Sequence, residues 1–254
     1  MSWVDVFTDD YVIGFMLLFF RFAALFMAVP IYSHKNIPMT IKAAMAFFFT
    51  ILFYPSMPPL VIEVTMPSII LAILSELLFG LAVGVILLLA YNAITFAGGQ
   101  ISFMMGFSMA SAIDPQSGVS MPIISQFLSL IGLMILLAMD MHHWILLFID
   151  GSISAIPLGG FVMSEDLFNY TIKATSNMFM VGFMIAFPII AITFLQDVIF
   201  GMLMKTMPQF NLLVIGFPIK IMFAFLVLIA TLSATMLILK TQMQDAFNYL
   251  EMFF

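Results

Sequence analysis

Long apolar runs, separated by short polar or broken stretches, dominate this chain. A helix needs about 20 residues to cross a hydrocarbon core of roughly 30 Å. Because lipid offers no partner for free backbone N–H and C=O groups, such runs span as helices. Six runs are long enough, at 11–31, 41–62, 68–94, 121–139, 174–196 and 212–239. The pattern predicts an all-α membrane protein with about six long, partly broken apolar helices arranged in helical hairpins.

The segment ISFMMGFSMASAIDPQSG, residues 101–118, departs from this pattern. Gly98 and Gly99 precede it and can end the third helix, because glycine adopts conformations closed to other residues. Pro115 disfavours helical geometry at Asp114. We therefore expect a central apolar re-entrant loop of about a dozen residues, which needs enclosure by protein or a cavity to line.

Further interruptions occur in and between the other runs. The short apolar pieces 143–149 and 198–204 are candidates for re-entrant or amphipathic segments. YPSMPP at 54–59, Pro188 and Pro218 are expected to break or kink their helices and to free carbonyl groups. Those carbonyl groups need partners, which favours neighbouring protein over lipid.

Three charged side chains lie well inside the apolar runs. Arg21, Glu76 and Lys220 would each cost about 2.5 to 3.5 kcal/mol at a bilayer centre. Such residues face a protein interior, a pore or a partner subunit. We expect Arg21 and Glu76 to pair with each other or with a partner subunit, fixing helix register more than adding stability.

Two glycines on the third run have the G-x-x-x-G spacing. Gly80 and Gly84, in GLAVG, let a second helix approach closely. Packing within the chain and a contact with another subunit both remain open.

Composition supports the membrane assignment and removes several function classes. Of 254 residues, 64% are hydrophobic and 8% are charged, whereas a soluble surface needs roughly a quarter charged. The net charge of −6 provides no basic patch for nucleic acid. Without cysteine there are no disulfides, thiolate nucleophiles or cysteine metal sites. The acidic N-terminus is atypical of a cleavable signal, so the first run is expected to stay.

The sequence around two histidines is the strongest candidate for a metal site. Asp140, His142, His143 and Asp150 lie within MDMHHWILLFID. Adjacent histidines point apart on a helix and lack the i, i+4 spacing of a metal pair. We interpret the stretch as an interfacial loop with Trp144 at the headgroup level, and expect no metal.

Catalytic motifs are weak. GFSMA at 106–110 approaches the G-x-S-x-G elbow, but Ala110 replaces the last glycine and only His142 or His143 could act as a base. The sequence contains no P-loop. We predict neither enzymatic activity nor a cofactor.

The distribution of lysines indicates an orientation. Lys35 and Lys42 flank the first connection and Lys205 lies in the fifth, and six spans would place these connections on the same, cytoplasmic side. Both termini would then be periplasmic or extracellular, although Lys173 and Lys240 fall on the opposite side.

Methionine is unusually frequent, with 25 Met beside 30 Phe. Its flexible, polarizable side chain reshapes around irregular contacts. Met104, Met105 and Met109 gather in the segment that is expected not to form a regular span, where they could act as a deformable seal.

Four motifs are spread over most of the chain: RFAALFMAVP at 21–30 followed by Pro38, SELLFGLAVG at 75–84, GGQISFMMGFSMASAIDPQSG at 98–118, and PQFN at 208–211 with GFPIK at 216–220. Together they resemble the FliR family, the export-gate component of bacterial flagellar type III secretion, with its injectisome relatives. Gly98 and Met104 replace residues that are often Ala and Gln in the family, and Lys205 replaces a usual Arg.

The resemblance implies a subunit of a helical multi-subunit pore in the bacterial inner membrane, at the flagellar basal body. It implies assembly with FliP and FliQ and passage of unfolded flagellar substrates under control of FlhA and FlhB. Residues 1–175 would be FliP-like and include the loop, and 176–254 would form a FliQ-like hairpin. Family gates lie largely out of the bilayer toward the periplasm, so sister subunits as well as membrane lipid would cover the apolar surface.

The resemblance also implies roles for individual residues. Residues 103–116 would plug the resting pore. The expected plug residues are Met104, Met105, Gly106, Phe107, Met109, Asp114 and Pro115. The polar positions expected at structural or inter-subunit contacts are Arg21, Glu76, Lys205, Gln209, Asn211 and Lys220.

Two other functions stay open at this point. A secondary transporter binds its solute between broken helices, but it would need matched interruptions in two halves and a chain of ionisable groups. A scaffold would nucleate assembly while partners line the conduit.

Overall fold

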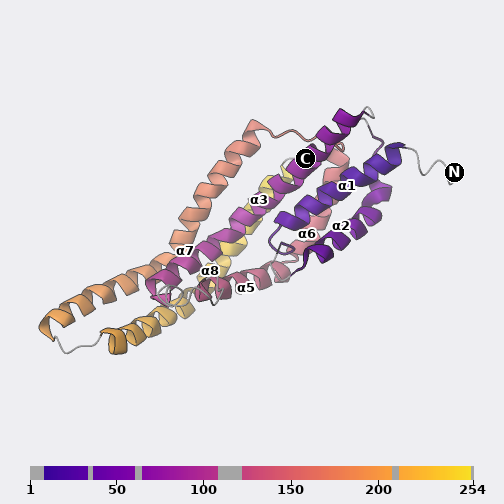
Figure 1. Cartoon of the computed structure of the whole chain (residues 1–254). Coiled ribbons are helices and arrows are strands. Elements are labelled where there is room, and N and C mark those ends of the chain that lie inside the picture. The colour runs from indigo at the N-terminus through magenta and orange to yellow at the C-terminus, as the bar shows by residue number, and fades with distance from the viewer. Residues whose placement is uncertain (1–8, 34–36, 61–64, 108–121, 208–211, 253–254) are drawn as a thin grey trace. The chain divides into compact units, whose positions relative to one another are not determined.

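The computed structural model describes residues 9–33, 37–60, 65–107, 122–207 and 212–252, and every regular element within them is a helix (Figure 1). The α-helices are α1 (Asp9–Ala28), α2 (Met39–Phe53), α3 (Met66–Met104), α5 (Ile123–Ala138), α6 (Met141–Ala155), α7 (Glu165–Thr206) and α8 (Phe217–Glu251). A 3₁₀ turn, η2 (Tyr54–Ser56), follows α2, and a π-helical turn, η4 (Leu212–Gly216), precedes α8.

Five of the described helices are long and apolar enough to cross a membrane. The count rises to six if α5 and α6, bent by 61° at their junction, form one broken span. The prediction of an all-α membrane protein with long, partly broken apolar helices is confirmed.

The chain forms two compact units that interleave along the sequence. The first comprises Met1–Leu89, Leu136–Ala174 and Met243–Phe254, and the second comprises Ala90–Ile135 and Thr175–Gln242. Helices α3, α7 and α8 therefore each contribute to both units. The expected FliP-like and FliQ-like parts concern similarity to other chains, and that division stays a prediction.

An aromatic cluster holds α1 against α2 in the first unit. Phe22 and Phe26 of α1 are fully buried. The Phe22 ring lies 6.0 Å from Phe49 and 5.5 Å from Phe53 of α2, and the Phe26 ring lies 5.4 Å from Phe49. Aromatic pairs at these separations add to the stabilisation from apolar burial.

Hydroxyl groups and glycines join the helices of the second unit. The Tyr91 hydroxyl of α3 donates to the Ser129 carbonyl of α5 at 2.6 Å, and the Ser125 hydroxyl donates to the Thr95 carbonyl at 2.6 Å. A Cβ on Gly182 of α7 would lie 2.9 Å from the carbonyl oxygen of Ala93. Small and hydroxylated residues are the usual means of packing helices closely where lipid surrounds them.

The predicted helix end at Gly98 and Gly99 is wrong, because α3 continues to Met104. A Cβ on Gly98 would lie 2.4 Å from the Ser125 Cα of α5, so this glycine allows two helices to touch. The helix therefore includes residues 101–104 of the apolar segment.

The two short apolar pieces are helical. Residues 143–149 lie within α6, so the interfacial loop expected for 139–150 is wrong, whereas the bent pair of α5 and α6 is either a broken span or a re-entrant segment. Residues 198–204 continue α7. Pro188 lies inside α7, which extends past it to Thr206, and Pro218 lies in the first turn of α8, where proline is tolerated. YPSMPP does break its run, because α2 ends at Phe53.

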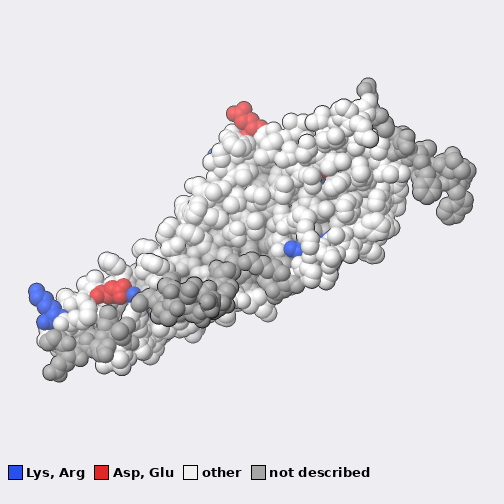
Figure 2. Space-filling view, in the orientation of Figure 1, with Lys and Arg blue, Asp and Glu red and all other residues white. Residues whose placement is uncertain are grey.

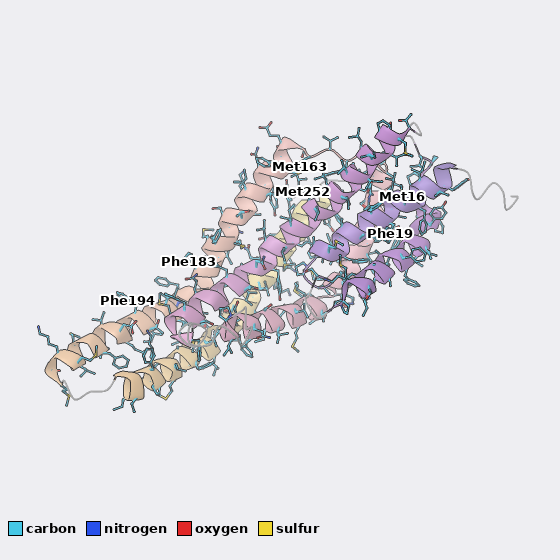
Figure 3. The ribbon with its side chains drawn as sticks, viewed as in Figure 1. Met16, Phe19, Met163, Phe183, Phe194 and Met252 are labelled. Atoms are coloured by element: carbon cyan, nitrogen blue, oxygen red, sulfur yellow. The ribbon has the colours of Figure 1, made fainter. Side chains whose placement is uncertain are left out.

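Large apolar side chains cover much of the surface. Most of the face in Figure 2 carries no charge. On α7, Phe183 and Phe194, labelled in Figure 3, are 51% and 65% exposed. A surface of this kind needs lipid or protein to cover it.

Candidate functional site

A fully buried ion pair joins α1 to α3 in the first unit. The Arg21 Nη2 donates to Glu76 Oε1 at 3.0 Å, and its Nε donates to the other carboxylate oxygen. Neither side chain is exposed to solvent. The guanidinium carbon also lies 4.7 Å from the centre of the Phe79 ring, a cation–π arrangement. The structure thus adopts one of the two arrangements that the sequence left open.

The end of α6 and the turn after it complete this polar network. Arg21 Nη1 donates to the Ser152 carbonyl at 3.2 Å and Nη2 to the Ile156 carbonyl at 3.3 Å. Carbonyls at a helix C-terminus carry partial negative charge, which suits a cation. The Gly159 N–H donates to Glu76 Oε1 at 2.6 Å. One buried pair therefore ties together α1, α3 and α6.

The G-x-x-x-G spacing acts within the chain. A Cβ on Gly80 would lie 2.6 Å from the Ala24 Cβ, and one on Gly84 would lie 2.2 Å from the Ala28 Cβ. Both glycines thus face α1, one turn apart, beside the ion pair. Of the two open alternatives, the structure shows packing within the chain.

The C-terminal end of α3 carries the first four predicted plug residues. Met104 ends the helix and Met105 is fully buried, while Gly106 and Phe107 are partly exposed. Gly106 has φ +84°, a left-handed conformation that glycine adopts at little cost. A Cβ there would also lie 2.9 Å from the Phe217 ring at the start of α8. The remaining predicted plug residues lie outside the described residues, namely Met109, Asp114 and Pro115.

A second ion pair lies in the hairpin of α7 and α8. Lys220 Nζ donates to the two Asp197 carboxylate oxygens at 2.7 and 2.8 Å. The Lys220 side chain is buried, whereas that of Asp197 is 52% exposed. The sequence analysis missed Asp197, although this acid and Lys220 lie at similar distances from the turn between the two helices. Lys205 is exposed, and the positions of Gln209 and Asn211 lie outside the described residues.

The histidine stretch differs from its prediction. Asp140, in a left-handed conformation with φ 55°, precedes α6, and the rings of His142 and His143 lie 4.1 Å apart rather than pointing away from each other. One possible ligand atom from each of the three residues lies within 4.8 Å of the others. All three side chains are exposed or half-buried, so water can reach them. The expected absence of a metal stays a prediction. Trp144 packs against Phe247 of α8, with 4.1 Å between ring centres.

Comparison with known proteins decides the family. Residues 12–246 match the model of bacterial export proteins, family 1. The chain belongs to this family. The resemblance inferred from the four motifs is thereby confirmed.

Several known proteins are similar to this chain over most of their length. The flagellar biosynthetic protein FliR of Bacillus subtilis (strain 168) is 33% identical over 231 residues, 89% of each chain. The protein of that name in Escherichia coli (strain K12) is 29% identical, over 79% of this chain and 77% of its own. That of Aquifex aeolicus (strain VF5) is 26% identical, over 97% and 95%. The family-1 match thus includes both units.

Proposed function

We propose that the chain is a non-enzymatic subunit of the flagellar type III protein export gate in the bacterial inner membrane. The observation that carries this proposal is the match to bacterial export proteins, family 1, from residue 12 to 246, with relatives named flagellar biosynthetic protein FliR. The five or six apolar helices fit a membrane-embedded component. Both termini would face the periplasm.

The gate would be hetero-oligomeric, with FliP-like and FliQ-like chains forming the channel and FlhA and FlhB acting on substrate entry. The apolar faces of α7 and α8 are exposed, which supports contacts with other proteins. Helices that carry charged side chains or breaks have polar groups that lipid cannot pair, so neighbouring protein is the more suitable environment. Lys205, Gln209 and Asn211 would make polar contacts with neighbouring subunits. Unfolded flagellar proteins would be the cargo.

Residues 103–116 would form the plug that closes the channel at rest. Met104, Met105, Phe107 and Met109 would supply its compliant apolar seal. Gly106 has a left-handed backbone conformation and lies close to the Phe217 ring, which supports a fixed attachment at the N-terminal end of this segment. Asp114 and Pro115 would fix its C-terminal end.

Secretion by living cells tests the function. Deletion of the gene should abolish export of flagellar proteins, and the wild-type chain should restore it. The intact complex, purified from a strain carrying a tagged chain, should contain FliP-like and FliQ-like subunits by mass measurement. A chain that purifies alone and carries out solute exchange in vesicles would instead support the secondary transporter, and the export proposal would fall.

The plug requires a separate test. Removing residues 109–113 should leave the complex assembled but make the membrane permeable to small ions, because the seal would be lost. A conservative variant of the same segment, Met109→Leu, should keep the membrane tight. Unchanged ion permeability in an assembled complex with the shortened segment would refute the plug while leaving the export function untouched.

A further inference from the structure

Three side chains with metal-binding atoms gather where α5 ends and α6 begins. Asp140 lies in the break between the two helices, and His142 and His143 lie in the first turn of α6. One ligand atom from each residue lies within 4.8 Å of the other two. The expectation of no metal assumed that adjacent histidines point apart on a helix, whereas these two ring centres are only 4.1 Å apart. The structure thus removes the reason for that expectation.

The Asp140 carboxylate lies close to a histidine and does not cap the helix. An aspartate before the first turn commonly accepts a hydrogen bond from a free backbone N–H, but the Asp140 side chain makes no such bond. Its Oδ1 lies 3.5 Å from His143 Nδ1. Two ligands of one tetrahedral Zn²⁺ ion lie about 3.4 Å apart, because each bond is about 2.1 Å long. This pair therefore already has the spacing of two metal ligands.

His142 provides a nitrogen atom without a competing partner. Its Nδ1 is buried and makes no hydrogen bond with any residue that the structure describes. Buried polar atoms normally have a partner, and a neutral imidazole nitrogen can obtain one by binding a metal ion. Asp140 and His143 are exposed, so rotation about their side-chain bonds can bring all three ligands to one ion.

The backbone that carries the two histidines is fixed by packing. Met141 and Ile145, on either side of them in the sequence, are buried. The ring centre of Trp144 lies 4.1 Å from that of Phe247 in α8. Ligands on a fixed backbone lose less conformational freedom on binding. The positive end of the α6 dipole disfavours a cation here, and the negative charge of the carboxylate offsets it.

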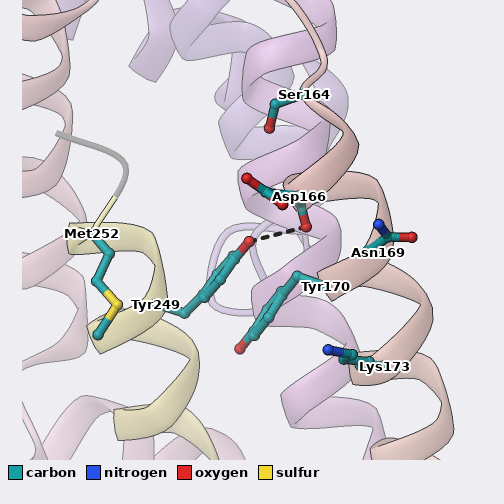
Figure 4. Close-up of a pocket in the computed structure, with 7 residues that line it drawn as sticks. All are labelled: Ser164, Asp166, Asn169, Tyr170, Lys173, Tyr249 and Met252. Carbon is teal, nitrogen blue, oxygen red and sulfur yellow. Dashed lines mark hydrogen bonds between the residues drawn. The ribbon is translucent and has the colours of Figure 1, made fainter.

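A polar pocket of about 520 Å³, between the beginning of α7 and the end of α8, lacks such a ligand set (Figure 4). Asp166 provides its single carboxylate, and the ammonium of Lys173, on the same helix, repels cations. The Tyr249 hydroxyl donates to the backbone carbonyl of Asp166 at 3.3 Å, as the dashed line in Figure 4 marks. Among the described residues, the group at Asp140 is the one whose ligand atoms lie close enough together for a metal ion.

We propose that Asp140, His142 and His143 bind one divalent transition-metal ion of the Zn²⁺ class. Zn²⁺ accepts two imidazole nitrogens with one carboxylate oxygen, and three protein ligands leave one tetrahedral position for water. Imidazole ligands favour Zn²⁺, Cu²⁺ and Ni²⁺ over Mg²⁺ and Ca²⁺, which prefer oxygen. The ion ties the break between α5 and α6 to the first turn of α6. This assignment does not depend on the export function.

Zinc binding by the purified protein tests the site. The full chain, with whatever membrane subunits purify with it, is isolated through an affinity tag without histidine and stripped of metal with a chelator. Competition with a zinc-sensitive dye then measures how many Zn²⁺ ions bind and how tightly. The wild type should bind one more Zn²⁺ ion per chain than His143→Gln does. Mg²⁺ in the same assay should not displace it.

Three variants remove one ligand each. Asp140→Asn, His142→Gln and His143→Gln should each weaken Zn²⁺ binding at least about tenfold, because loss of even an outer-shell partner commonly costs that much. Asparagine, like aspartate, tolerates the left-handed backbone conformation at position 140. The matched control is Asp150→Asn, which changes another exposed acid of α6 and should bind Zn²⁺ as the wild type does.

Thermal unfolding separates loss of the site from loss of the fold. Zn²⁺ should raise the melting temperature of the wild type and of Asp150→Asn, but not of the ligand variants, because it binds the folded state. Without metal, Asp140→Asn and His143→Gln should melt as the wild type, since both side chains are exposed. Wild-type affinity in these two variants would overturn the site. Equal weakening by Asp150→Asn would mean diffuse binding to surface acids and would overturn it as well.

Discussion

At the scale of single residues, the buried pair of Arg21 and Glu76 carries an energetic cost as well as a gain. Removing two charges from water carries a desolvation cost that their attraction and hydrogen bonds must offset. Arg21 obtains carbonyl acceptors from α6 in addition to the Glu76 carboxylate, and Glu76 obtains the Gly159 N–H. Because these partners come from separate helices, the pair specifies how α1, α3 and α6 align more than it raises stability.

Breaking one half of this pair should be worse than removing both halves. Arg21→Met leaves the Glu76 carboxylate buried and uncompensated, and should destabilise the first unit by about 3 to 5 kcal/mol. In Arg21→Met/Glu76→Met the charge is gone, so much of that loss should be recovered. Melting temperatures in detergent would measure both variants. A double variant that melts lower than the single one would contradict this expectation, because it would show that the unpaired carboxylate costs less than its replacement by methionine.

At the scale of elements, the close contact of α3 with α5 provides a matched pair of neighbouring glycines. A Cβ on Gly98 would lie 2.4 Å from the Ser125 Cα, whereas one on Gly99 would meet nothing within 4 Å. Gly98→Ala should therefore push the two helices apart and destabilise the second unit. Gly99→Ala should stabilise it by about 0.5 to 1 kcal/mol, because alanine loses less backbone freedom in a helix. Opposite shifts of melting temperature are expected, and equal shifts would contradict this contact.

The same two glycines show how far the sequence could be used to predict the fold. Apolar run length predicted the long helices, because the hydrocarbon thickness is a local requirement. The predicted end of α3 was wrong because Gly98 is needed for close contact with α5, and the sequence around Gly98 does not show that contact. The helix ends at Met104, just before Gly106, where φ is +84° and Phe217 lies close by. Pairing of Arg21 with Glu76 could be anticipated from their isolation in apolar runs, whereas the Gly159 N–H and the α6 carbonyls could not, since backbone partners carry no sequence signal.

At the scale of the whole molecule, more large apolar side chains are exposed than is usual for a protein that is stable on its own in water. On α7, the exposed positions alternate with a buried stripe that includes Ile185, Ile189 and Thr193. One face of the helix thus packs within the second unit, and the opposite face needs lipid or another subunit.

Phe194 provides a test of what covers that opposite face. It is 65% exposed and follows the buried Thr193 (Figure 3). In Phe194→Glu, a charge would have to enter an apolar environment, at a cost of about 2.5 to 3.5 kcal/mol near a bilayer centre. We expect the variant to be lost from the purified complex and flagellar protein secretion to fall, whereas Phe194→Leu should behave as the wild type. Because the side chain makes little contact within its own unit, the isolated fold should tolerate either change. Full assembly with glutamate at this position would mean that water reaches this face of α7, as it would in the lumen of a channel.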